Sequence, residues 1–138
     1  MSQPQIPSVQ LQSVHHIAII CSNYEVSKKF YTDVLGCSIV KETYRAERDS
    51  YKLDLAINDN YIIELFSFPN PPARPSQPES CGLRHLAFSV KDIEASIAAL
   101  ASKGVRCEPI RIDTLTNKRF TFFADPDGLP LELSLIHI

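Results

Sequence analysis

The sequence contains one short pattern twice, and this duplication limits the folds that the chain can adopt. Residues 16–27 (HIAIICSNYEVS) align with residues 85–96 (HLAFSVKDIEAS), and the two copies share His, Ala, Glu and Ser at equivalent positions. Further along, Gly36 and Gly104 each stand 28 residues before a Glu-Leu pair. Matched spacing over two half-chains predicts two copies of one small module.

Each copy shows the order strand, helix and then several strands. In the first, a capping-box pattern at Ser22–Glu25 predicts a helix that ends at Gly36. In the second, Asp92 is the predicted cap of a helix that ends at Gly104. The predicted apolar helix positions are Val26, Phe30 and Val34 in the first copy and Ile93, Ile97 and Leu100 in the second. The predicted strands are 14–21, 38–44, 52–57 and 61–68, then 83–90, 106–112, 119–124 and 129–135.

The chain divides at a proline-rich segment. Residues 69–78 hold five of the ten prolines, and such a segment is extended and stays out of a sheet interior. We therefore expect an α+β fold in which two modules are joined by a linker. The expected divisions are an N-terminal tail 1–12, a first module 13–68, a linker 69–82 and a second module 83–138, with 13–138 forming one domain.

One histidine and one glutamate of each module are predicted to lie on the sheet face turned away from the helix. Successive side chains of a strand point to opposite faces, so Glu132 lies opposite its leucine neighbours. The same alternation places His16, Glu64 and His85 on the corresponding faces of their strands. A carboxylate among apolar neighbours is costly to desolvate without a partner. A divalent cation that binds His16, Glu64, His85 and Glu132 supplies that partner.

Two imidazoles and two carboxylates suit Zn, Ni, Co, Fe or Mn, and the ligand types alone leave the choice among these metals open. We expect no ligand role for the other two histidines. His15 has the opposite strand parity and no counterpart in the second module, and His137 lies near the end of the chain.

Composition argues against several other classes of protein. A net charge of −2 without a basic block gives no electrostatic reason to expect nucleic acid or a membrane surface as partner. The apolar runs are too short for a membrane helix. Four glycines are too few, at their spacing, for a phosphate-binding loop or a dinucleotide fingerprint. The expected partner is a small-molecule substrate.

The cysteines indicate a reducing compartment. The four cysteines contain no CxxC pair, and residues 2–12 are polar and do not resemble a signal peptide. Disulfides belong mainly to oxidising compartments. We therefore expect a cytoplasmic protein.

The strand motifs HHIAII, RHLAFSV and YIIEL and the closing DPDGLPLEL resemble the vicinal oxygen chelate superfamily, which includes bleomycin resistance proteins. Within it, the chain is similar to bacterial glyoxalase I-like proteins of the lactoylglutathione lyase type over about residues 13–136. The resemblance implies paired βαβββ modules whose curved mixed sheets form a metal-binding cleft. The family's ligand positions fall on His16, Glu64, His85 and Glu132. It also implies a homodimer in which His16 and Glu64 of one chain meet His85 and Glu132 of the other.

The resemblance further implies a metal-dependent lyase or isomerase. The metal polarises the carbonyl of a small substrate resembling a 2-oxoaldehyde or a hydroxyacid, and it stabilises the enediolate that forms when a neighbouring carbon loses a proton. A glutamate that loosens from the metal is a suitable general base. Glu132 and Glu64 are the candidates, with a slight preference for Glu132.

Two positions depart from the glutathione-dependent enzyme. In bacterial glyoxalase I an arginine stands four residues after the first His ligand and an asparagine four residues after the first Glu ligand, whereas this chain has Ile20 and Phe68. The loss of these two polar anchors argues against a glutathione adduct as substrate. The residues that can hold another anion are Arg84, Arg111, Lys118 and Arg119.

Other functions within the superfamily stay open. An epimerase that acts on an acyl-CoA typically carries Gln where this chain has Glu64. An extradiol dioxygenase binds Fe(II) with two histidines and one carboxylate, and Glu64 as a further ligand would crowd that site. Binding proteins that sequester a drug in the same cleft lack the metal ligands. A metal-stabilised scaffold without activity is the remaining alternative.

Overall fold

The computed structural model describes residues 6–135 and confirms the duplicated architecture. The first half forms a four-stranded sheet in the order β1-β4-β3-β2, in which β1 pairs with β4 in parallel and the other neighbours are antiparallel. Its elements are β1 (Ile17–Cys21), α1 (Tyr24–Lys29), the π-helical turn η1 (Phe30–Val34), β2 (Ser38–Arg45), the 3₁₀ turn η2 (Ala46–Arg48), β3 (Ser50–Ile57) and β4 (Asn60–Ser67).

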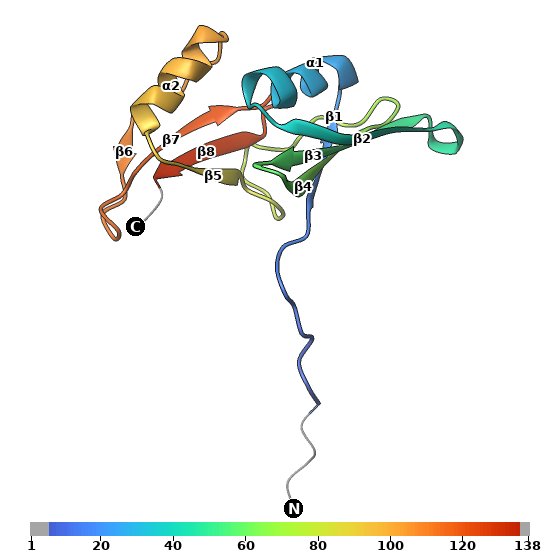
Figure 1. Cartoon of the computed structure of the whole chain (residues 1–138), viewed down its shortest axis with the longest axis horizontal. Helices are drawn as coiled ribbons and strands as arrows, with labels where there is room; N and C mark the ends of the chain where they lie inside the picture. Colours follow the sequence, from blue (N-terminus) through green and yellow to red (C-terminus); the bar gives the residue numbers. More distant parts are fainter. Residues whose placement is uncertain (1–5, 136–138) are drawn as a thin grey trace, which may run out of the picture.

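The second half repeats this topology in the sheet β5-β8-β7-β6, again with the first pair parallel and the others antiparallel. Both helices lie above the sheets in Figure 1, and the N-terminal segment runs away below them. The fold is therefore two βαβββ modules. The elements are β5 (Leu86–Val90), α2 (Ile93–Ser102), β6 (Arg111–Ile112), β7 (Arg119–Ala124) and β8 (Pro130–Leu135).

Equivalent residues cap the two main helices. The side chain of Asn23 accepts a hydrogen bond from the backbone N–H of Val26, and Asp92 accepts one from Ala95. The prediction of Ser22 as the cap is wrong by one residue. The Asn23 carboxamide makes the bond expected of a cap, while the Ser22 N–H donates to the second module.

Of the apolar positions predicted for the first helix, Phe30 is buried and Val34 packs partly buried against the core, whereas the prediction for Val26 is wrong. Val26 is half exposed, whereas Tyr24, Ser27, Phe30 and Tyr31 are buried. Tyr24 and Ser27 are buried before the change from α to π geometry at Phe30, so the buried face is displaced from Val26 already within α1. The predicted end at Gly36 is confirmed, because Gly36 has a φ of +76°, which glycine adopts at little cost.

The predicted strand over 106–112 is too long, since β6 covers only Arg111 and Ile112. Pro109 has no backbone N–H for a ladder bond, and Glu108 makes an isolated backbone bond to the Phe122 carbonyl. The first strand of each module also begins later than predicted, one residue after His16 or His85. Both histidines therefore lie at strand entrances.

One continuous core joins the modules. Leucines of β3, β4 and β8 are buried under the helices, and residues of both halves belong to one apolar cluster. The segment between β4 and β5 forms no helix or strand, as the prolines predict. In the part of the chain that the structure describes, no helix is long and apolar enough to cross a membrane. The expected tail residues 1–5, residues 136–138 of the second module and His137 lie outside the described residues.

Candidate metal centre

The first His–Glu pair lies on the face of the first sheet that is turned away from α1. Glu64 is in the middle of β4, in register with Ala18 of the parallel strand β1. His16 directly precedes β1, and its Nε2 lies 3.5 Å from Glu64 Oε2. The predicted partnership of His16 with Glu64 is thus present in the fold.

The second module repeats this arrangement. Glu132 of β8 is in register with Ala87 of β5, two residues after His85. His85 Nε2 lies 3.3 Å from Glu132 Oε1. Both pairs therefore have the same structural arrangement: a histidine directly before a strand lies beside a glutamate of the parallel neighbouring strand.

The donor atoms of each pair fit a shared cation. Two protein ligands on one divalent metal, each at about 2.0–2.2 Å, lie about 3.0–3.5 Å from each other. The Nε2–Oε distances of 3.5 Å and 3.3 Å are in or at the edge of this range. Each pair alone supplies two ligands, which is half of the four that the sequence analysis predicts.

A single chain does not bring the four predicted ligands together. Among residues 6–135, no group of three or more His, Cys, Asp and Glu side chains is arranged to hold a metal ion. The chain instead presents two separate half-sites, His16–Glu64 and His85–Glu132.

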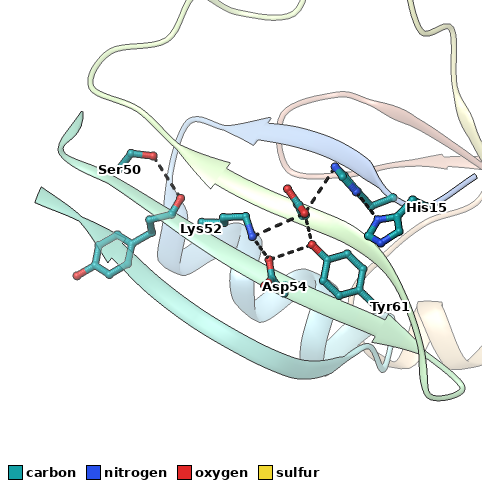
Figure 2. Close-up of polar contacts among 8 residues, drawn as sticks. His15, Ser50, Lys52, Asp54 and Tyr61 are labelled. Carbon is teal, nitrogen blue, oxygen red and sulfur yellow. Dashed lines mark hydrogen bonds and ion pairs between the residues drawn. The ribbon is translucent and has the colours of Figure 1, made fainter. Parts of the chain in front are cut away.

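Glu64 belongs to a polar network that the sequence analysis missed. Tyr61 Oη is within hydrogen-bond distance of Glu64 Oε2 and lies 3.3 Å from Asp54 Oδ1. Lys52 Nζ lies 2.8 Å from Asp54 Oδ1 and 3.7 Å from Glu64 Oε2. Figure 2 shows Lys52, Asp54 and Tyr61 converging over the sheet. Asp54 and Glu64 are also register partners across β3 and β4.

The network has clear electrostatic effects. Asp54 and Glu64 are both buried. Burial raises the pKa of Tyr61 above its usual value, and the hydrogen bond to Glu64 raises this pKa further, so Tyr61 keeps its proton at neutral pH. The hydrogen bond to Asp54 raises the pKa of Lys52, which therefore stays charged between the two carboxylates. The sequence does carry a signal for this network, because Lys52 and Asp54 alternate with buried leucines along one strand.

Glu132 has a different environment. Its register partner on β7 is Phe122, in the position that Asp54 occupies beside Glu64. The Phe122 ring meets the His85 ring edge-on at 5.1 Å, and the Ser134 hydroxyl donates to Glu132. Glu132 also lines a pocket of about 260 Å³ with Lys118.

The second ring nitrogen of each histidine also has a neighbour. Nδ1 of His16 lies 2.8 Å from Nδ1 of His15, a residue for which no role was predicted. Nδ1 of His85 lies 3.2 Å from Nη1 of Arg84, which can only donate. The guanidinium of Arg84 and the carboxylate of Glu132 therefore contact different nitrogens of the His85 ring.

The four cationic residues proposed as anion holders separate into two groups. Arg119 is paired with Glu94 on the helix side. Arg84, Arg111 and Lys118 lie near the second half-site, since Arg84 contacts His85 and Lys118 lines the Glu132 pocket. Arg111 packs over the rings of Phe120 and Phe122, 5.3 Å from each centroid.

Comparisons with known proteins agree with this fold. Residues 13–133 match the sequence model of the Glyoxalase/Bleomycin resistance protein/Dioxygenase superfamily. The chain is 66% identical over 123 residues to the uncharacterized protein YaeR of Escherichia coli (strain K12), covering 89% of this chain and 95% of YaeR. A glyoxalase family protein from Enterococcus faecalis, known from its crystal structure, is 49% identical, with a TM-score of 0.84 over 89% of this chain and 97% of that chain.

A more distant relative carries a name that describes a reaction. The protein named 2-epi-5-epi-valiolone epimerase from Actinomyces sp is 28% identical over 142 residues, which cover 88% of this chain and 78% of the relative.

Proposed function

Because the chain belongs to the Glyoxalase/Bleomycin resistance protein/Dioxygenase superfamily, we propose that it is a metal-dependent lyase or isomerase of the glyoxalase I-like type. It moves a proton next to a carbonyl group of a small substrate that resembles a 2-oxoaldehyde or a hydroxyacid. The observation that carries this proposal is the pair of matched half-sites, with Nε2–Oε distances of 3.5 Å and 3.3 Å.

The proposed metal ligands are His16, Glu64, His85 and Glu132. Proteins of the superfamily commonly bind a divalent metal. When bound, a divalent cation supplies Lewis-acid polarisation of the substrate carbonyl and stabilises negative charge on its oxygen. The mixed nitrogen and oxygen donors suit Zn, Ni, Co, Fe or Mn.

A homodimer completes the proposed site. Each chain offers two half-sites that it does not combine itself. In a twofold dimer the surfaces of the two chains are equivalent, so pairing the first half-site of one chain with the second half-site of its partner creates two identical sites. In this arrangement the metal supplies positive charge to the buried carboxylate of Glu64 and to the half-buried carboxylate of Glu132, which offsets the cost of their burial.

The surroundings of the two glutamates assign different roles to them. Tyr61 and Lys52 hold Glu64 in place, which suits a fixed ligand. Glu132 accepts from the Ser134 hydroxyl, lies beside His85 and lines a pocket, with no lysine or tyrosine holding it among the described residues. We therefore assign the proton transfer to Glu132: its carboxylate takes the proton from the carbon beside the carbonyl and returns it to the neighbouring carbon.

The substrate is not expected to be a glutathione adduct. Ile20 is 55% exposed on the face of His16, where an arginine stands in the glutathione-dependent enzyme. Phe68 follows β4 and lies in a stack with Phe66. Neither side chain can bind a carboxylate. The likeness to a protein named as an epimerase supports proton transfer at carbon as the reaction class.

The experiment combines elemental analysis with proton exchange. Purified protein should contain a divalent metal, and incubation with 2-oxoaldehydes and 2-hydroxyacids in D₂O should introduce deuterium beside the carbonyl, as NMR detects. Glu132→Gln should abolish the exchange, whereas Glu47→Gln, a change at an exposed turn, should leave it intact. A metal-free protein without exchange on any of these compounds would contradict the proposed function.

A further inference from the structure

An arginine-rich cavity lies beside the second half-site. It has a volume of about 460 Å³ and is lined by the end of β7, by the segment before β6 and by part of the linker between the modules. Its charged lining residues are Arg74, Arg84, Arg106, Arg111, Glu79 and Glu108. Four guanidinium groups against two carboxylates give the lining a net charge of +2, although the whole chain carries −2.

The four arginines are not equally available to a ligand. Arg74 donates to the carbonyls of Leu83 and Arg84, at 2.6 Å and 3.1 Å, and so fixes the linker. Arg84 and Arg111 pair with exposed glutamates at 3.0 Å and 2.8 Å. Surface pairs of this kind contribute little free energy and exchange readily with another anion.

Arg106 has no such partner. Within residues 6–135, no carboxylate lies within ion-pair distance of its guanidinium. The side chain is exposed and lines the cavity. A guanidinium matches the planar geometry of a carboxylate or phosphate and binds it through two parallel hydrogen bonds.

The cavity shares a wall with the half-site. Phe122 lines the cavity and at the same time packs edge-on against the His85 ring at 5.1 Å. Arg84 lines the cavity and contacts His85 Nδ1. Arg84 therefore contacts both the cavity and the half-site.

We propose that this cavity binds an anionic group of the substrate, a carboxylate or a phosphate, with Arg106 and Arg111 as its principal donors. As a statement about the substrate, the inference rests on the proposed function. It restricts the substrate class to acids whose reacting carbon lies at His85 and Glu132 while the anionic group lies beyond Phe122. Arg84 couples the two places.

The test measures binding of inorganic phosphate and of malonate to the full-length, metal-containing protein by calorimetry at low ionic strength. The double variant Arg106→Met/Arg111→Met should bind the preferred anion about tenfold or more weakly, because charged hydrogen bonds are lost. Lys103→Met/Arg119→Met is the matched control: it removes two positive charges, as the double variant does, from positions outside the cavity, and it should bind as the wild type does. The probe that binds with the higher affinity shows whether the cavity favours a phosphate or a carboxylate.

Equal affinities for the wild type and Arg106→Met/Arg111→Met, or an equal loss in Lys103→Met/Arg119→Met, would overturn the anion site. The metal content of the same samples gives a separate reading. Absence of metal contradicts the proposed function, whereas a metal-containing protein whose anion binding ignores Arg106 and Arg111 contradicts only this inference.

Discussion

The Tyr31 hydroxyl donates a buried hydrogen bond of 2.8 Å to Asp125 Oδ2, and this bond ties the first module to the second. Tyr31 belongs to the helical turn after α1, whereas Asp125 opens the turn between β7 and β8. Asp125 Oδ1 also accepts from the backbone N–H groups of Asp127 and Leu129. One carboxylate therefore organises the turn and joins the two halves of the core.

Replacing Tyr31 by Phe should lower the free energy of unfolding by about 2 kcal/mol, because a buried hydrogen bond to a charged group is lost. Urea unfolding followed by circular dichroism measures this change. Tyr44→Phe is the control, since Tyr44 makes a similar bond to Asp49 at an exposed position and should change stability little. Equal effects of the two substitutions would show that the bond between the modules contributes no more to the free energy of unfolding than an exposed bond does.

The tyrosines predict how stability depends on alkaline pH. Burial raises the pKa values of Tyr24, Tyr31 and Tyr61 above their usual 10.0. The folded state thus binds these protons more tightly than the unfolded state does. Stability should be constant below pH 10 with respect to these groups and should fall as the pH rises above it. Phenolate absorbance should rise at higher pH in the native protein than in urea, where all five tyrosines should ionise near pH 10.

Native protein in which all five tyrosines ionise together near pH 10, with the circular dichroism spectrum unchanged, would contradict this expectation.

Tyr61→Phe tests the network around Glu64. The substitution removes the hydroxyl that bonds Glu64 and approaches Asp54. Loss of such a supporting hydrogen bond typically weakens metal binding by about tenfold or more, so we expect a lower affinity for the native metal with an unchanged fold. Tyr51→Phe removes a hydroxyl from the same sheet without touching Glu64 and should retain wild-type affinity. Identical metal affinities for both variants would show that Tyr61 does not contribute to metal binding.

Much of the fold could be predicted because the sequence contains the pattern of strands and helix ends twice, once in each module. Gly36 and Asp92 mark helix ends through local backbone chemistry, and local signals of this kind can be identified in a sequence. The displaced cap at Asn23 would have followed from the alignment itself, since Asn23 is the equivalent of Asp92. The π-helical turn at Phe30 depends on tertiary packing, which no local pattern shows.

The site could be predicted only in part for a related reason. Strand parity placed Glu64 and Glu132 on the correct faces, because alternation is a property of the strand alone. The contacts of Tyr61 with Asp54 and of Phe122 with His85 cross between strands. Such contacts depend on register, which the sequence does not specify by itself.

The most direct test of the central claim combines two variant chains, each of which lacks one of the two half-sites. One carries His16→Ala/Glu64→Gln and the other His85→Ala/Glu132→Gln, and each alone should lose the metal and the proton exchange. In a mixed dimer with shared sites, the intact half-sites of the two chains meet at one of two positions. The mixed dimer, separated from the two homodimers after co-expression, should therefore regain about half of the wild-type metal per dimer, together with exchange activity. Mixed dimers that contain no metal and catalyse no exchange would contradict a cation shared between the first half of one chain and the second half of its partner.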